Sequence, residues 1–334
     1  MKKIVLLLPL LFCFMSACEV EFTPNAEWKE IPVVYCILDQ DLDTTWVRVE
    51  RCFLAEGNMY DYGTISDSIN YPVGSIRVVL CAYSNGQCID TIVCRDTLCD
   101  RVEGNFSNLA QPLYFTTASL DENYMYKLLI TRVSNGNVLA YTDSIPLILQ
   151  KPSSNGILIR KPSNTDRFGF FQRSGTDAVC YIEWYVLENA RRYQPIVRFY
   201  YLEEGDTHYV DLHCNTVTES PLRPQTQSTL YSRESFRASI CSLLKDDTLP
   251  KRSLNKVDLY LTACSEDLNA YISSLNVNSN NAVDQGSEAY TNIHNGKGVF
   301  ASRRTQLYKS LRADSSVVPN VGLVWYLRSY GIGF

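Results

Sequence analysis

Short apolar runs alternate with turn residues along the first half of the chain. The runs are rich in β-branched and aromatic residues and predict strands at residues 32–38, 46–53, 75–83, 88–94, 113–117, 124–133 and 138–145. In the second run, Trp46, Arg48 and Glu50 fall on one face of the strand. Val47 and Val49 fall on the other face, which can therefore pack on a core. The spacing of the runs is typical of an antiparallel sandwich.

The second half contains further strand-like runs, at residues 179–187, 196–202, 208–212 and 257–263. Two helices interrupt these runs. Ser232 is a suitable N-cap for a helix reaching Leu244, whose apolar stripe contains Phe236, Ile240, Leu243 and Leu244. Ser265 precedes a second helix, which opens with acidic residues and continues on one face with Leu268, Tyr271, Ile272 and Leu275.

A linker of turn-forming residues, Lys-Pro-Ser-Ser-Asn-Gly, occupies residues 151–156. We place a domain boundary there, with an N-terminal β-sandwich domain at residues 29–150 and a C-terminal β-rich domain with two short helices at residues 151–334. A chain of 334 residues is long enough for two domains that each bury a core. We therefore predict a mostly β fold of two Ig-like or fibronectin-III-like β-sandwich domains, the second with helical insertions.

The chain begins with a basic and then apolar leader. Lys2 and Lys3 precede an apolar run at residues 4–15, which only Pro9 interrupts. A transmembrane helix requires about 20 residues, so this run is too short to span a bilayer. Together with the small residues that follow, the pattern predicts a signal peptide at residues 1–17.

The predicted leader ends at a cysteine. Met15-Ser16-Ala17-Cys18 resembles the bacterial lipobox, which implies lipid on Cys18, cleavage before it, and residues 18–28 as a tether. Several acyl chains hold a protein firmly, because each buried methylene contributes about 0.8 kcal/mol. The alternative is an ordinary secreted protein whose first cysteine merely follows the cleavage site. Glu19 and Glu21 resemble acidic surface-export signals, and we expect an outer-membrane anchor with the body at the cell surface rather than on the periplasmic face.

The charge pattern argues against nucleic acid as a partner. The formal net charge is -5, and acidic and basic residues are interleaved without a basic stripe. No apolar run after the leader is long enough to span a bilayer, so we expect the chain to contact the membrane only through its lipid.

Of the 12 cysteines, ten follow the lipobox, in a compartment that could oxidise them. Asn85-Gly86 predicts a two-residue hairpin turn, whose register places Tyr83 opposite Cys88 and Cys81 opposite Asp90. Cys81 and Cys88 would then be diagonal neighbours about 7 Å apart, farther than a disulfide normally tolerates. We expect most of these cysteines to be reduced and to serve as small apolar residues.

Candidate metal ligands are few. Asp39, Asp41 and Asp43 alternate in a loop and could point carboxylates at a calcium ion, although the residues that follow depart from the EF-hand pattern and a solvated turn is the alternative. His208 and His213 are an odd number of positions apart in a strand, which sends their side chains to opposite faces. We assign no catalytic, metal-binding or cofactor-binding residue.

Residues 58–71 are predicted to form a loop that carries Tyr60, Tyr62 and Tyr71. Exposed rings there could stack on a sugar or contact a protein partner. Tyr is equally an ordinary strand residue, so purely structural use is the alternative. Loops on a rigid β scaffold are where recognition usually occurs.

Several segments resemble known families. Trp184-Tyr185, residues 189–193 and residues 197–201 look like the opening of a fibronectin-III-type domain. The strand-like run at residues 257–263 leads into Ser265-Glu266-Asp267-Leu268-Asn269-Ala270-Tyr271 and is followed by Thr291-Asn292-Ile293 and Gly296-Lys297-Gly298-Val299-Phe300. This order is similar to the C-terminal signature of a large family of Bacteroidota outer-membrane lipoproteins of unknown function. Because members are frequently encoded beside TonB-dependent receptors, the resemblance implies an accessory role in uptake.

Three functions remain open from the sequence. The first is a non-enzymatic accessory or binding subunit of a TonB-dependent nutrient transporter. The second is a surface adhesion or structural lipoprotein. The third is a glycan-acting hydrolase, which requires two acidic residues about 5 to 10 Å apart. The sequence contains neither a Gly-x-Ser-x-Gly elbow nor a His-Glu-x-x-His motif, and we expect no enzymatic activity.

Overall fold

A computed structural model describes residues 29–53, 58–101, 110–149, 157–158, 167–168, 179–219, 226–244, 252–280, 289–313, 325 and 327–328. The predicted signal peptide, Cys18, the tether up to residue 28 and the linker at residues 151–156 lie outside these residues. The described chain is mostly β, as the sequence predicts.

Two sheets face each other in the first half of the chain. Part of the first consists of β1 (Pro32–Leu38), β2 (Thr45–Arg51), β5 (Arg95–Cys99) and β6 (Gln111–Thr116). The other, which we call the second sheet, consists of β3 (Ile76–Ser84), β4 (Gln87–Val93), β7 (Met125–Arg132), β8 (Val138–Thr142), β9 (Ile145–Pro146) and β18 (Ile293–His294). Alternate apolar side chains from both sheets meet in one core, which includes Val34, Val49, Leu80, Leu128 and Ile130.

The second half has its own core. It contains β13 (Arg192–Glu203), β14 (Asp206–His213), β15 (Val217–Thr218) and β17 (Arg252–Cys264), and a small sheet of β10 (Ile157–Leu158), β12 (Val179–Tyr185) and β16 (Thr226–Ser232). Helix α4 (Arg233–Leu243) packs on them, with the ring of Phe236 edge-on to that of Phe199. The Ser232 side chain caps this helix by accepting from the backbone N–H of Ser235, which confirms the predicted cap.

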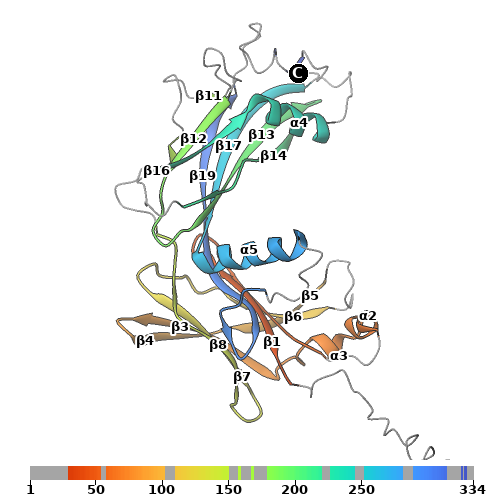
Figure 1. Cartoon of the computed structure of the whole chain (residues 1–334), viewed down its shortest axis with the longest axis vertical. Coiled ribbons are helices and arrows are strands. Elements are labelled where there is room, and N and C mark those ends of the chain that lie inside the picture. Colours follow the sequence, from red (N-terminus) through yellow and green to blue (C-terminus); the bar gives the residue numbers. More distant parts are fainter. Residues whose placement is uncertain are drawn as a thin grey trace, which may run out of the picture.

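One strand joins the two halves. The first residues of β19 (Lys297–Ala313) pair in parallel with β1, and its later residues pair antiparallel with β17 (Figure 1). The result is a ten-stranded sheet, which we call the long sheet. Eight of its strands follow the order β14-β13-β17-β19-β1-β2-β6-β5, while β11 (Arg167–Phe168) pairs with β19 and β15 pairs with β13. Gly298 has φ +108°, and a Cβ there would lie 2.0 Å from the carbonyl oxygen of Val34, so the parallel pairing depends on glycine.

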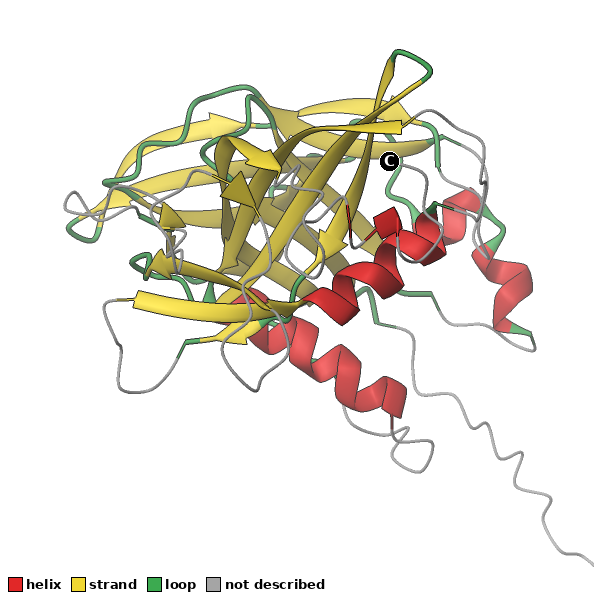
Figure 2. Ribbon diagram, turned by 90° about the horizontal axis from the view of Figure 1, so that it is seen from above, coloured by secondary structure: helices red, strands yellow, loops and turns green. Residues whose placement is uncertain are grey.

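Helix α5 (Glu266–Asn280) lies where the two halves meet. Its Leu268, Tyr271 and Ile272 pack on residues of β1 and β19 that include Tyr35 and Val299. We call this face of the long sheet its outer face, because the cores lie on the opposite side. Figure 2 shows the longer helices toward one side of the molecule, although α5 packs on the outer face and α4 on the core of the second half. Leu275, expected on the buried stripe, is 44% exposed, because the helix packs on the sheet through Leu268, Tyr271 and Ile272 in its first two turns.

Most predicted strands are confirmed, with shifts of a few residues at their ends. Strands β5, β16 and β19 were not predicted. In the hairpin of β3 and β4, Tyr83 lies opposite Cys88 as predicted, but Cys81 lies opposite Thr91 rather than Asp90. The predicted register is wrong because a bulge between the two pairs adds one residue to β4.

Candidate functional site

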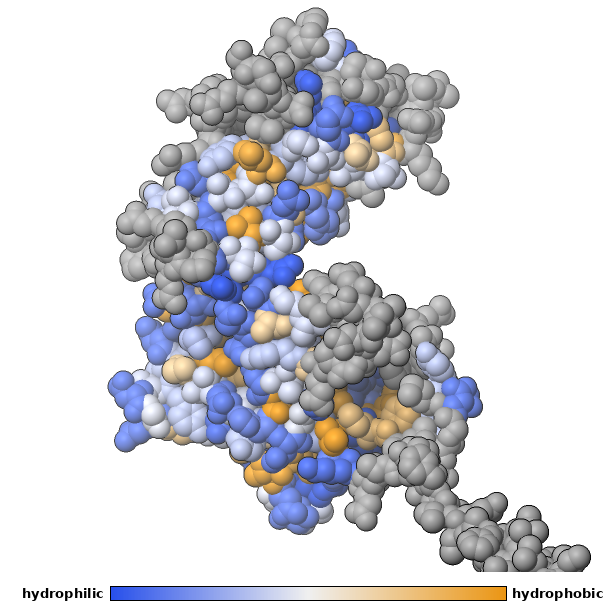
Figure 3. Space-filling view, in the orientation of Figure 1, coloured by the Kyte–Doolittle hydropathy of each residue, from blue (hydrophilic) through white to orange (hydrophobic). Residues whose placement is uncertain are grey.

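The outer face of the long sheet contains a pocket beside the short helix α3 (Ser66–Ile69), which follows α2 (Met59–Gly63) in the chain. Its volume is about 570 Å³, and we call it the Arg48 pocket. It is lined by Val33, Tyr35, Arg48, Glu50, Arg51, Cys52, Phe53 and Ile69. The outward residues of β1 and β2 form its floor because side chains alternate along a strand. Apolar surface gathers on this side of the first half, below α5 (Figure 3).

Charged groups on the floor of this pocket share one carboxylate. Oε1 of Glu50 accepts from Arg48 Nη2 at 2.6 Å and from Arg101 Nη2 at 2.8 Å. The side chains of Glu50 and Arg101 are only 16% and 10% exposed, so water screens this pair weakly, whereas Arg48 is 36% exposed. Arg51 donates to the backbone carbonyl oxygen of Asp67 in α3. With three arginines against one glutamate, the local charge is positive, although the whole chain has a net charge of -5.

Aromatic rings form the walls of the Arg48 pocket. The hydroxyl of Tyr271 in α5 donates to that of Tyr35 at 3.4 Å. Burial raises the pKa of Tyr35 well above its ordinary value, so this hydroxyl is protonated at neutral pH. Opposite it, the ring of Phe53 stacks on that of Tyr62 with centroids 6.3 Å apart.

The three tyrosines of the predicted loop at residues 58–71 therefore differ in their relation to the Arg48 pocket. Tyr62 supports the pocket wall through Phe53, and Tyr60 is 63% exposed on α2. The expectation that Tyr71 is exposed is wrong, because its side chain belongs to the core between the two sheets. Burial raises its pKa above the ordinary value, and nearby Glu30 adds to the shift.

An aromatic platform adjoins the pocket on the same face. Trp46, predicted on the outward face of its strand, is 45% exposed and packs against Phe115 of β6 with centroids 5.2 Å apart. The guanidinium of Arg95 lies 4.8 Å above the Phe115 ring. An exposed tryptophan beside a basic group can stack on a sugar ring or contact a protein partner.

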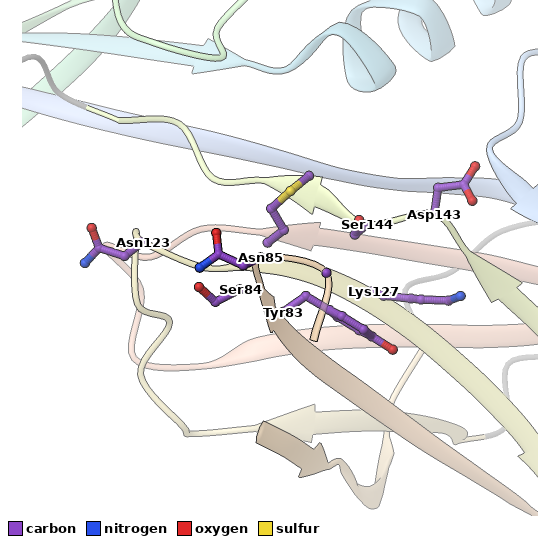
Figure 4. Close-up of a pocket in the computed structure, with 9 residues that line it drawn as sticks. Tyr83, Ser84, Asn85, Asn123, Lys127, Asp143 and Ser144 are labelled. Carbon is purple, nitrogen blue, oxygen red and sulfur yellow. The ribbon is translucent and has the colours of Figure 1, made fainter. Parts of the chain in front are cut away.

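A second pocket lies at the turn of the β3–β4 hairpin. Its volume is about 540 Å³, and we call it the hairpin pocket. It is lined by Tyr83, Ser84, Asn85, Gly86, Asn123, Met125, Lys127, Asp143 and Ser144 (Figure 4). Beside it, Lys127 Nζ lies 5.1 Å from the centre of the Tyr141 ring, on which His294 stacks. His294 Nε2 lies 3.1 Å from Asp143 Oδ2, so this histidine contacts a carboxylate that also lines the pocket.

A third cluster occupies the outer face of the second half. Arg198 of β13 donates to both carboxylate oxygens of Asp211 at 2.7 Å each. Its guanidinium also lies over the rings of Tyr209 and Tyr260, at 4.2 and 4.8 Å. The sequence analysis missed this cluster, since its members come from three strands. The alternation within each strand was the available signal, because it places Arg198 and Tyr200 on one face.

Two of the three candidate calcium ligands, Asp39 and Asp41, bind arginines instead. Asp39 Oδ2 accepts from Arg303 Nε at 3.1 Å, and Asp41 pairs with Arg304. His208 stacks on Tyr201, whereas His213 lies on the other face of β14, as predicted. Among the residues that the structure describes, no cluster of three or more His, Cys, Asp or Glu side chains is arranged to hold a metal.

No helix within the described parts of the chain is both long and apolar enough to cross a membrane. The chain matches no protein-family model, and it matches no curated protein.

Proposed function

We propose that this protein is a lipid-anchored outer-membrane lipoprotein at the cell surface, and that it is a non-enzymatic accessory or binding subunit of a TonB-dependent nutrient transporter. The observation that carries the proposal is the apolar leader that ends at Met15-Ser16-Ala17-Cys18. The similarity of residues 257–271 and 291–300 to Bacteroidota outer-membrane lipoproteins supports the transporter part of the proposal.

We also propose that each half is a variant of an Ig-like or fibronectin-III-like sandwich. Support comes from the first half, where two sheets enclose one core. The second half has a small antiparallel sheet that contributes Trp184 to a core shared with β13 and β17. The parallel pairing of β1 with β19 departs from that architecture, which is antiparallel.

The surfaces on the outer face favour binding over hydrolysis. The Arg48 pocket combines the charge triad of Glu50, Arg48 and Arg101 with apolar and aromatic walls, a composition typical of binding sites. Its acid, Glu50, is held by two arginines. Glycoside hydrolysis requires instead two carboxyl groups that face each other across the substrate.

Copurification in detergent tests the transporter part of this proposal. The full chain, tagged at its C-terminus, is extracted from its native membrane, and bound proteins are identified by mass spectrometry. We expect a TonB-dependent receptor in stoichiometric amount. A chain that stays alone under mild detergent, while a known receptor complex of the same membrane survives, contradicts this part.

Mass spectrometry of the mature N-terminus tests the anchor. We expect acylated Cys18 as the first residue, and we expect Cys18→Ser to release the protein from the membrane fraction. Ser16→Thr provides a control for general effects of changing the leader. An unacylated N-terminus, or one at another residue, contradicts the anchor.

A surface adhesion protein is the second candidate, and the exposed Trp46–Phe115–Arg95 platform favours it. Attachment assays with a deletion strain distinguish the two functions. Loss of attachment with unchanged nutrient uptake favours adhesion, and loss of uptake with unchanged attachment favours the transporter role.

A further inference from the structure

Two cysteines meet on the outward face of the second sheet. The bulge in β4 leaves Cys88 opposite Tyr83 and brings Thr91 opposite Cys81. An extra residue on one strand increases the local twist and changes where the neighbouring side chains point. The separation of about 7 Å expected for regular diagonal neighbours therefore does not apply to this pair.

The contacts of Cys88 show where its sulfur lies. Cys88 Sγ is 3.7 Å from Thr91 Oγ1 and 3.4 Å from the carbonyl oxygen of Asp90. The sulfur therefore points along β4 toward Thr91, the residue that lies opposite Cys81. Burial raises the pKa of the Cys81 thiol, and Cys88 adds to that rise because the two side chains are neighbours. Both thiols are free in the structure.

The surroundings of the pair differ between its two members. Cys88 is exposed, whereas Cys81 is 8% exposed and lies beneath it. Lys127 of β7 lies directly opposite Cys81 on the other side of β3 and also lines the hairpin pocket. Burial raises the pKa of Cys81 and the positive charge of Lys127 opposes that rise.

We propose that Cys81 and Cys88 form a redox pair that closes to a cross-strand disulfide beside the hairpin pocket. The oxidant is a disulfide, either of a dithiol oxidase in the export compartment or of oxidised glutathione. Exposed Cys88 attacks it as a thiolate and forms a mixed disulfide, releasing one thiol of the oxidant. The Cys81 thiolate then displaces the second thiol. Two hydrogens leave the protein, and the oxidant is reduced to two thiols.

Other cysteine pairs lack this combination of closeness and access. Cys36 and Cys94 belong to the same core cluster, but both are buried, so an external disulfide cannot reach either sulfur. Cys99 of β5 is half-buried and provides a matched reference thiol. The structure therefore predicts one selective bond.

The Cys81–Cys88 disulfide would hold the edge strand of the second sheet in place. β4 is the last strand of the second sheet, and it pairs only with β3 among the described strands. A covalent link across this pair holds the edge strand in register and keeps Tyr83 and Lys127 in place at the hairpin pocket. Reduction would loosen this wall of the pocket.

Peptide mapping tests the proposal, which rests on the proposed export only for the state found in cells. Purified full-length protein is treated with oxidised glutathione, remaining thiols are alkylated, and the protein is digested with chymotrypsin. Cleavage after Tyr83 separates the two cysteines, so only a disulfide keeps their peptides together. We expect this linked species, lighter by two hydrogens, in wild type and in Cys99→Ser, and its complete loss in Cys88→Ser.

The possible results of this mapping test two questions separately: whether the disulfide forms, and whether the protein resides in an oxidising compartment. If oxidised glutathione modifies Cys99 in wild type while Cys81 and Cys88 stay unlinked, the proposed pair is wrong. The same mapping is then applied to protein that is alkylated during lysis of its native cells. A linked pair there supports both the bond and export to an oxidising compartment. A pair that links in vitro but is fully reduced in cells supports the bond and contradicts that location.

Discussion

Arg303 donates through Nε to the carboxylate of Asp39 over 3.1 Å, and this pair fastens the middle of β19 to the loop that follows β1. Asp39 is 5% exposed, and its other oxygen accepts from the backbone N–H of Asp41. The contact lies where β19 changes its partner from β1 to β17. The acidic loop that resembled a cation site thus joins the two halves.

Removing this carboxylate should destabilise the fold. We expect Asp39→Ala to lower the free energy of unfolding by about 1 to 3 kcal/mol, because the backbone N–H and the guanidinium both lose their acceptor. Asp41→Ala is the matched control. Its carboxylate is 40% exposed, and we expect a loss of less than about 1 kcal/mol. Urea denaturation measures both, and equal losses would contradict the special role of Asp39.

The parallel contact of β1 with β19 should not tolerate a side chain at residue 298. We expect Gly298→Ala to cost more than about 3 kcal/mol, because the added Cβ would meet the Val34 carbonyl while the backbone stays at φ +108°. Gly86→Ala has a similar positive φ but open space around it, and we expect about 1 to 2 kcal/mol. Thermal denaturation of both variants separates the steric cost from the conformational one. Similar costs would mean that the close approach does not limit pairing.

The triad in the Arg48 pocket should contribute to stability as well as to charge. We expect Glu50→Gln to lower the free energy of unfolding by about 1 to 3 kcal/mol, because it leaves the largely buried guanidinium of Arg101 without a counter-charge and removes the acceptor of Arg48. Glu122→Gln is the control, since Glu122 is 55% exposed and 3.6 Å from Arg304, and we expect at most about 0.5 kcal/mol. Urea titrations at low and high salt measure both. A large, salt-sensitive loss for Glu122→Gln alone would contradict the expectation.

Alkaline pH should unfold the protein through its buried acids. Burial raises the pKa of the Cys94 thiol from 9.0 to about 11, and burial together with Asp96 raises that of Tyr114 to about 12. A raised folded-state pKa means that the stabilisation is complete below the unfolded-state value and is lost as pH rises toward the folded-state value. Between pH 9 and 11 the Cys94 contribution alone should fall by up to about 1.4 kcal/mol per pH unit.

Urea denaturation from pH 7 to pH 11 tests this expectation. The free energy of unfolding should fall from about pH 9 upward, and Cys94→Ala should show a shallower fall than wild type because it removes one such group. An unchanged free energy of unfolding across the range would mean that these groups titrate alike in both states.

The local part of the fold could be predicted from the sequence. Alternation identified strands such as β1 and β7, and Ser232 marked the start of α4, because these signals lie within a few residues of one another. Strand β5 was missed because its sequence, Arg-Asp-Thr-Leu-Cys, is largely polar and mostly solvent-facing. The Asn85-Gly86 turn predicted the hairpin but not its bulge, since the turn does not determine the pairing farther along the strands.

The surfaces could not be predicted in the same way. Arg48 and Glu50 share a face of β2, which alternation indicates, but Arg101 and Tyr271 come from distant segments. The same holds for Asp39 and Arg303. Such contacts depend on how strands order themselves across a sheet, and that order is set by long-range packing.

The pairing of β19 with both β1 and β17 also affects the order in which the two halves can fold. Residues 297–302 of β19 are synthesised 264 positions after the residues of β1 with which they pair, from Val33 with Lys297 to Leu38 with Ser302. The edge of β1 that β19 covers therefore stays unpaired while this long stretch of chain is made. Completion of both halves by one late segment would make assembly a single, all-or-none event.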